Sequence, residues 1–342
     1  MRLFKGVKNF FRENYKLIIF FLIFYFVINF PVPYYVFTSG GITDLSDRFI
    51  IDGSYEQKGS YNLSYVNQAE GNVLTYLLSF VLPEWETVEI ENYQINENES
   101  VNDVLLRDRL SLTQANQSAV LLAYTRAGKK AEIKSTKFYV TAIYDFLESS
   151  EQIKIGDILL KVEGISVDEF EDITEKVQNS KVNDYLTLEL ERNGDIYESK
   201  VKVQNKDGAN LMGLGFYRIY DLELDPEIKF TFKDSESGSS AGLMTTLAIY
   251  DSLIEEDLTH GLKIAGTGTI SSSGKVGEIG GVKYKLAGAV KGKASIFLVP
   301  KGENYEEAIK VKKDRNYDIE IVEIETLDQA ISFLKNYKTT KE

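Results

Sequence analysis

An uncharged apolar run at residues 17–36 constrains the fold of this chain more than any other feature of its sequence. The run reads LIIFFLIFYFVINFPVPYYV, and basic side chains precede it in residues 1–16. As a helix it would span roughly 30 Å, the thickness of the hydrocarbon core of a bilayer. Basic residues before such a span stay on the cytoplasmic side. We therefore predict a cytoplasmic tail over residues 1–16, a transmembrane signal anchor over residues 17–36, and an extracellular location for the rest of a single-pass cell-membrane protein. A cleaved signal peptide fits less well, because the run is long for such a segment and no small-residue cleavage pattern follows it.

The composition excludes several kinds of active site. The chain has no cysteine and a single histidine, His260. Thiolate nucleophiles, disulfides and sulfur-based zinc sites are therefore excluded, and a Ser-His-Asp triad would have to use His260. The net charge of −13 argues against a nucleic-acid partner, because such proteins present basic surfaces to phosphates. We predict no cofactor and no metal, and a hydrolase is directed toward carboxylate or serine–lysine chemistry.

Residues 37–134 and 135–205 are predicted to form two regions beyond the anchor. The first is an α+β region that ends in a helix over residues 113–126, with a capping box at Ser111 and a stop at Gly128. The second has strand-like runs at residues 137–143 and 158–162, then an amphipathic helix, then a hairpin at Asn193-Gly194. This order resembles the PDZ domains attached to bacterial serine proteases, and the resemblance implies binding of an extended peptide at a sheet edge. A small α+β module without a ligand is the alternative.

The sequence Gly-Leu-Gly-Phe at residues 213–216 lies after the expected PDZ-like domain. In PDZ domains a glycine-containing loop of this kind should precede the first strand, where it would capture a carboxylate. We interpret residues 213–216 as a turn and strand that open the next domain, predicted over residues 206–342.

Two helix starts framed by glycines carry the residues suited to catalysis. Gly238, Ser239, Ser240 and Ala241 precede a helical pattern, and the unpaired N–H groups at such a helix start can stabilise an oxyanion. The second start reads Gly-Gly-Val and ends on Lys283, where the helix dipole disfavours a charged amine and favours a neutral base. Taken singly, the two segments are better explained by a serine that caps a helix and by an ordinary solvated lysine.

Together these segments resemble the proteolytic domain of Lon-type serine proteases, which use a Ser-Lys dyad. The resemblance implies that Ser240 is the nucleophile, Lys283 the general base and Thr267 a supporting hydroxyl, with Gly238, Ser239 and Ala241 forming the oxyanion turn. Two departures are the serine at 239, where the family has proline, and Ser237, where Lon has an acidic residue. Over the whole chain, the order of segments resembles the membrane-anchored PDZ–Lon-type peptidases of Gram-positive bacteria.

We therefore predict an α+β multidomain protein with one N-terminal transmembrane helix and a PDZ-like domain inserted before a Lon-type α/β proteolytic domain. Its expected function is ATP-independent serine endopeptidase activity outside the cell, on secreted signalling peptides or small membrane-tethered proteins, and a homo-oligomer is allowed. A catalytically silent peptide-binding scaffold and a purely self-processing protein are the alternatives. Rival motifs lack their partners: the Gly-x-Ser-x-Gly pattern at 238–242 has no suitably placed histidine, and Ser272-x-x-Lys275 stands alone.

Overall fold

The structure is a computed structural model of the chain, and it describes residues 2–82, 84–149, 152–233 and 235–338. The chain divides into two compact units, one formed by residues 1–39 and 66–93 and the other by residues 40–65 and 94–342. The first unit contains, wholly or in part, α1 (Arg2–Asn29), β1 (Pro31–Asp44), β3 (Ser60–Asn72), α2 (Val73–Ser79), β4 (Trp85–Glu89) and the 3-10 helix η2 (Ile90–Tyr93). Strand β4 pairs antiparallel with β1, with Tyr34 opposite Glu89.

The prolines within the apolar run predict that its helix ends near Phe30, and the structure agrees: residues 17–36 do not form one continuous helix. Helix α1 ends at Asn29, and residues 31–36 belong to strand β1. Pro31 and Pro33 explain the break, because proline has no N–H for the helical ladder and disfavours helix in the residue before it. The apolar part that stays helical, residues 17–29, is about 20 Å long at 1.5 Å per residue. Among the described helices none combines the length and the apolarity needed to cross a membrane.

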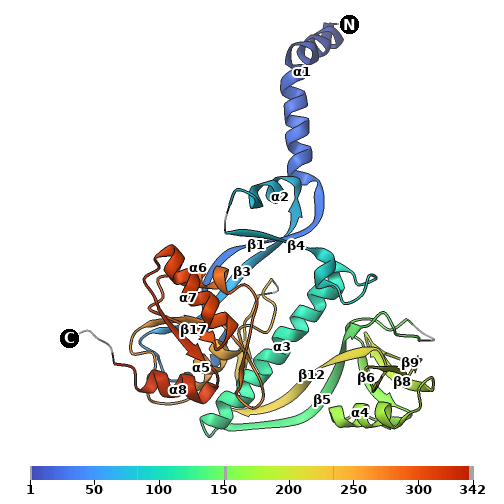
Figure 1. The fold of residues 1–342 in the computed structure, drawn as a ribbon, viewed down its shortest axis with the longest axis vertical. Coiled ribbons are helices and arrows are strands. Elements are labelled where there is room, and N and C mark those ends of the chain that lie inside the picture. Colours follow the sequence, from blue (N-terminus) through green and yellow to red (C-terminus); the bar gives the residue numbers. More distant parts are fainter. Residues whose placement is uncertain (1, 83, 150–151, 234, 339–342) are drawn as a thin grey trace. The chain divides into compact units, whose positions relative to one another are not determined.

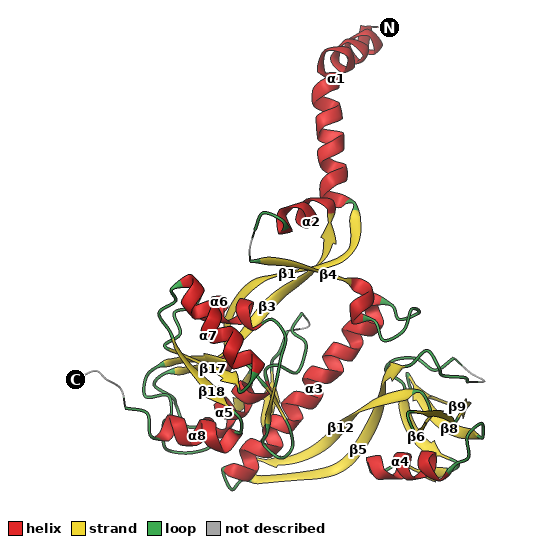
Figure 2. Ribbon diagram, in the orientation of Figure 1, coloured by secondary structure: helices red, strands yellow, loops and turns green. Residues whose placement is uncertain are grey.

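The second unit is built around a parallel sheet with helices on both faces. Its strand order is β18-β17-β14-β3, and every neighbouring pair is parallel. The elements of this part are β14 (Lys263–Gly266), β17 (Ile296–Pro300), β18 (Glu320–Ile324), α5 (Gly242–Ser252), α6 (Val282–Lys291), α7 (Glu303–Arg315) and α8 (Leu327–Lys335). Alternate residues of β17 face opposite sides: Ile296 and Leu298 pack with α5 and α8, whereas Phe297 and Val299 pack with α6 and α7. The layers are visible in Figure 2.

Residues 40–65 complete the core of this part of the chain. Leu45, Phe49, Ile51 and Tyr61 are buried in one hydrophobic cluster with α5 side chains such as Leu247. They lie on the 3-10 helix η1 (Leu45–Asp47), on β2 (Phe49–Ile51), which pairs with β13 (Ile228–Phe230), and on β3. Residues 40–65, predicted to belong to a separate N-terminal region, are therefore part of the same hydrophobic core as α5.

A second sheet in the same unit has the order β12-β5-β6-β8-β9, with β7 paired to β6. Its elements are β5 (Lys130–Ile143), β6 (Ile158–Val162), β7 (Ile165–Ser166), α4 (Phe170–Asn179), β8 (Tyr185–Arg192), β9 (Asp195–Lys202) and β12 (Leu214–Asp225). The remaining strands form two small hairpins, β10 (Gln204–Lys206) with β11 (Ala209–Leu211), and β15 (Thr269–Ile270) with β16 (Val276–Gly277). Ile173 and Val177 of α4 pack on this sheet, and we keep the name PDZ-like region for it.

The interpretation of residues 213–216 as the start of the next domain is wrong. Leu214 pairs with Ile143 and Phe216 with Val140, so this sequence begins β12, an edge strand of the PDZ-like sheet. The predicted boundary at residue 205 therefore cuts the sheet. Strand β12 continues to Asp225 in antiparallel register with β5, and helix α3 (Val101–Arg126) packs against this two-stranded ribbon and against α5 (Figure 1).

Helix α3 is longer than the helix predicted over residues 113–126. It begins at a capping box formed by Ser100 and Asp103, in place of the predicted box at Ser111. Its predicted end is confirmed, because Arg126 is the last helical residue and Gly128 follows with φ +67°. Apolar and polar residues are mixed along the whole length of α3, so nothing in its sequence marks Ser111 as the start of a helix.

Candidate active site

The turn before α5 presents backbone donors around Ser240. Gly238 has φ +86° and donates its N–H to the carbonyl of Asp108 over 3.1 Å, and Gly242 donates to the Ser239 carbonyl over 3.2 Å. The N–H groups of Ser239, Ser240 and Ala241 donate to no acceptor in the described part of the chain. Of the predicted oxyanion residues, Gly238 thus already donates its N–H to Asp108. The backbone N–H groups of Ser239 and Ala241, on either side of Ser240, are available to bind an oxyanion.

The segment after β14 holds Ser240 in place through its main chain. Gly268 donates its N–H to the Ser240 carbonyl over 2.9 Å, and the fully buried Thr267 donates its hydroxyl to the same oxygen over 3.2 Å. The start of α5 can lie this close to the segment after β14 only with glycine at 242, because a Cβ there would lie 2.8 Å from the backbone nitrogen of Ile270. Thr267, predicted as a supporting hydroxyl, therefore lies against the main chain of Ser240.

Lys285 brings a buried amine to Thr267. Its side chain lies on α6, which begins after Gly281 at φ +73°, a left-handed conformation that glycine adopts readily. The residue is 4% exposed, and Nζ lies 3.3 Å from Thr267 Oγ1. Among the described residues no carboxylate forms an ion pair with it. Burial lowers the pKa of the Lys285 amine to about 8, because a low-dielectric site disfavours the charged form.

Lys283, the predicted base, does not occupy this buried position. It is only half-buried, and its Nζ lies 4.8 Å from the centroid of the Tyr284 ring. The helical period explains the difference, because Val282, Leu286 and Ala289 form the buried stripe of α6 and Lys285 falls on that stripe. The predicted base and the buried lysine thus lie on the same helix, two residues apart.

Glu236 tethers the segment that leads into the Ser240 turn. Arg48, which is 8% exposed, places Nη2 2.7 Å from Glu236 Oε1. The other carboxylate oxygen of Glu236 accepts the N–H of Lys233 over 2.9 Å. Ser237, where Lon has an acidic residue, is exposed. Because Glu236 is paired with Arg48, its carboxylate holds the segment before the Ser240 turn in place.

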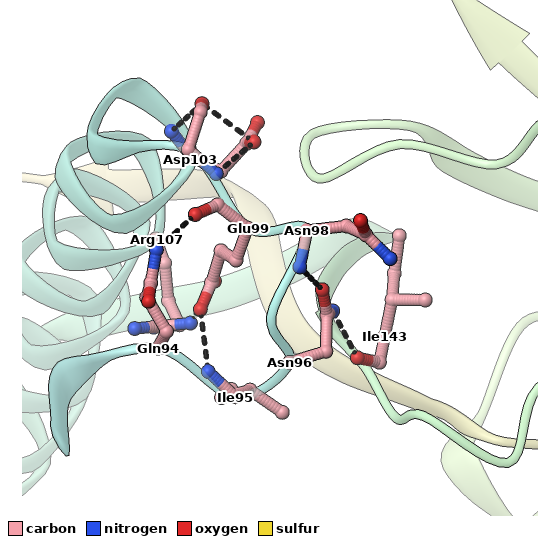
Figure 3. Close-up of polar contacts among 9 residues, drawn as sticks. Gln94, Ile95, Asn96, Asn98, Glu99, Asp103, Arg107 and Ile143 are labelled. Atoms are coloured by element: carbon pink, nitrogen blue, oxygen red, sulfur yellow. Dashed lines mark hydrogen bonds and ion pairs between the residues drawn. The ribbon is translucent and has the colours of Figure 1, made fainter. Parts of the chain in front are cut away.

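The N-terminal end of α3 is anchored by a buried ion pair between Glu99 and Arg107, as Figure 3 shows. Glu99 also accepts the N–H of Ile95 over 2.6 Å, and Asn96 donates to the Ile143 carbonyl at the end of β5. Burial raises the pKa of the Glu99 carboxyl despite these donors. Because the next turn of α3 carries the Asp108 carbonyl that holds Gly238, this network also supports the Ser240 turn.

The arrangement links the buried Lys285 amine, through Thr267, to the main chain of Ser240, and burial makes that amine easier to deprotonate than an ordinary lysine. Such a combination suits acyl transfer, in which an amine accepts the proton of an attacking alcohol and N–H groups hold the oxyanion. Within the described ranges, no group of three or more histidine, cysteine, aspartate and glutamate residues is placed to bind a metal ion.

Comparison with known proteins assigns this part of the chain. Residues 233–335 match the model of the Lon protease (S16) C-terminal proteolytic domain. The Lon protease of Campylobacter concisus is 32% identical over 125 residues, and that of Haemophilus influenzae is 33% identical over 127 residues. Each alignment covers 36% of this chain and 15% of the relative, so the chain spans a small part of the length of these proteins.

Among solved structures, PDZ domains of SdrC-like proteins are similar to part of the chain. The domain from Listeria monocytogenes is 16% identical, with a TM-score of 0.22, and the match covers 23% of this chain and 85% of that domain. The domain from Listeria innocua is 17% identical, with a TM-score of 0.23, and covers 24% and 93%. The family match and the geometry of the α5 and α6 helix starts agree in that residues 233–335 are similar to the Lon protease (S16) C-terminal proteolytic domain.

Proposed function

We propose that the chain is a serine peptidase in which Ser240 is the nucleophile and Lys285, in place of Lys283, is the general base. One observation carries the proposal: the buried Lys285 amine contacts Thr267 Oγ1, and Thr267 in turn contacts the Ser240 carbonyl. A buried lysine without a carboxylate partner is costly to keep, and such perturbed groups concentrate at functional sites. The match to a proteolytic domain supports the same chemistry.

The proposed reaction uses these groups in the following order. The neutral Lys285 amine accepts the hydroxyl proton of Ser240 as Oγ attacks the peptide carbonyl carbon. The N–H groups of Ser240 and Ala241 stabilise the negative oxygen of the tetrahedral intermediate. The Lys285 ammonium then gives its proton to the leaving amine as the C–N bond breaks, which leaves an ester on Ser240. Water hydrolyses that ester and restores the hydroxyl, with Lys285 again taking and returning a proton.

Ser240 is favoured over its neighbour Ser239 by its main-chain contacts. Both hydroxyls lie on a half-buried turn. The Ser240 carbonyl accepts bonds from Gly268 and from Thr267, the residue that Lys285 contacts. Ser239 has only its carbonyl bonded, to the N–H of Gly242. The residue that shares partners with the buried amine is the better nucleophile.

The PDZ-like region supplies a place for an extended chain. Strand β12 is an edge strand, and Gln117 occupies part of that edge by accepting the Tyr220 N–H over 2.8 Å and donating to its carbonyl over 2.7 Å. The start of β12, at residues 214–217, is left for a peptide that adds to the sheet. We infer that substrates are short or extended peptides. Secreted signalling peptides and small membrane-tethered proteins outside the cell remain the predicted substrate classes.

The test is labelling and cleavage by the full chain. A serine-reactive fluorophosphonate probe should label the wild type at Ser240, and a peptide mixture should be cut. Ser240→Ala and Lys285→Met should each abolish cleavage, whereas the matched changes Ser239→Ala and Lys283→Met should retain it. Full cleavage by the Lys285 variant would refute the assigned base. Intact folding with neither labelling nor cleavage between pH 7 and 9 would favour the alternative, a peptide-binding scaffold without activity.

A further inference from the structure

A cavity of 380 Å³ lies where α3, β12 and the segment after Thr269 meet. Its walls include Gln114 and Ser118 from α3, Arg218 and Tyr220 from β12, and Ile270 with Ser271 from the hairpin. The volume falls within the range of small-ligand sites and fits one side chain or chain end of a peptide. None of the proposed catalytic residues lines it.

Two side chains on the wall of this cavity, Arg218 and Gln114, have donor groups without acceptors among the described residues. Arg218 is half-buried, and no carboxylate within the described ranges forms an ion pair or hydrogen bond with its guanidinium. Gln114 Oε1 accepts the backbone N–H of Arg218 over 3.3 Å. The amide NH₂ group of Gln114 has no acceptor among the described residues. Arg126, also on the wall, differs because Asp328 binds it at 2.8 and 3.1 Å. An unneutralised guanidinium beside an amide donor calls for a ligand that is both negative and a strong acceptor.

The cavity borders the proposed nucleophile turn. Ile270 on its wall is in contact with Gly242, since a Cβ on that glycine would lie 2.8 Å from the Ile270 nitrogen. Gly242 is two residues after Ser240, and the Gly268 N–H holds the Ser240 carbonyl on the same segment. When Ser240 attacks a peptide bond, a residue of that peptide close to the bond can therefore reach this cavity.

We propose that the cavity is a substrate subsite in which Arg218 binds a carboxylate of the peptide close to the cleaved bond. The inference rests on the proposed function. The carboxylate is either an aspartate or glutamate side chain or the terminal carboxylate of the peptide, because both offer two acceptor oxygens to a guanidinium. Arg218 is then the residue that determines specificity, and its effect is confined to substrates that carry the charge.

The experiment begins with the full chain and a mixture of random-sequence peptides, with cut sites read by mass spectrometry. The preferred sequence is then made with Glu or Gln at the enriched position, and each peptide with a free or an amidated C-terminus. We expect the carboxylate to raise kcat/KM about tenfold to a hundredfold in the wild type, as for hydrogen bonds to a charged group. Arg218→Gln should reduce that preference to below about threefold and leave cleavage of the uncharged peptide unchanged. Arg218→Glu should favour a Lys peptide over the Glu peptide.

The matched control is Arg109→Gln, which removes the same charge from an exposed position of α3 outside the cavity and should keep the preference. Equal cleavage of charged and uncharged peptides by an active wild type, or an unchanged preference in Arg218→Gln, would overturn the subsite while leaving the peptidase intact. In Ser240→Ala, peptide affinity measured by fluorescence anisotropy tests the subsite without catalysis. Ser240→Ala should bind the carboxylate peptide more tightly than the uncharged peptide, and adding Arg218→Gln should abolish that difference. This result would support the subsite even if no cleavage is found.

Discussion

Replacing Lys285 by methionine removes a buried amine and leaves a side chain of similar length in its place. The ordinary pKa of a lysine is 10.5, and burial lowers that of Lys285 to about 8. At about 1.4 kcal/mol per pH unit, the difference corresponds to about 3 kcal/mol. Because the residue is only 4% exposed, solvent screens little of this energy. The amine therefore makes the folded protein less stable whenever it is charged.

The sign of the pH dependence follows from the two pKa values. Below pH 8 the amine is charged in both the folded and the unfolded chain, and the full desolvation penalty is present. Between pH 8 and 10.5 the unfolded chain binds more protons, so folding becomes more favourable as the pH rises. Above 10.5 both states are neutral and the penalty is gone. Lys285→Met should thus be the more stable protein at pH 7, and the gap to the wild type should narrow by about 3 kcal/mol toward pH 10.5.

Urea unfolding of the full chain, followed by circular dichroism at several pH values, measures this gap. The other titrating groups are the same in both proteins, so they cancel in the difference between wild type and variant. Cleavage should depend on the same deprotonation, with kcat/KM of the wild type rising through pH 8 and Lys285→Met inactive throughout. Lys283→Met is the control and should show neither effect. A gap between wild type and Lys285→Met that changes by less than about 1 kcal/mol over this pH range would refute the reasoning.

Three further changes test the supporting contacts. Thr267→Val removes the hydroxyl between the amine and the nucleophile and should lower kcat by about tenfold to a hundredfold with KM retained; steady-state kinetics that show no loss would exclude a supporting role. Gly242→Ala places a Cβ 2.8 Å from the Ile270 nitrogen and should destabilise the fold by about 1–3 kcal/mol in urea unfolding, whereas an unchanged midpoint would contradict the close approach. Gln117→Leu removes both hydrogen bonds to Tyr220 and should raise amide exchange at β12 by about tenfold, as expected for a loss of about 1–2 kcal/mol; exchange equal to that of the wild type would show that the edge is held by other contacts.

The helix starts around the site were predictable because glycines mark them. Small residues before Leu243 and the glycine pair before Val282 identify α5 and α6 without any long-range information. The choice between the two lysines of α6 was harder, because proximity to the glycine pair suggested Lys283. The apolar positions Val282 and Leu286 are four residues apart, so they define the inward face, and Lys285 shares it. Counting the helical period from Val282 would have selected the buried lysine.

Other parts of the fold depend on pairing that no local pattern reveals. The Gly-Leu-Gly-Phe sequence comes last in its region, and only its register with Ile143 and Val140 shows that it belongs to the same sheet as β5. Strand β3 pairs with β14, which lies about 200 residues further along the chain. By contrast, the end of the N-terminal helix is visible locally, because Pro31 interrupts the apolar run.

The placement of residues 40–65 restricts how the catalytic part could be set free from α1. Phe49 on β2 and Tyr61 on β3 sit inside the same core as α5, so a fragment beginning at residue 206 would expose that core and lose a strand of its sheet. A proteolytic cut that releases this part with its core intact must therefore lie upstream of residue 40. A recombinant protein intended for assay in solution has to respect the same limit and begin before that residue.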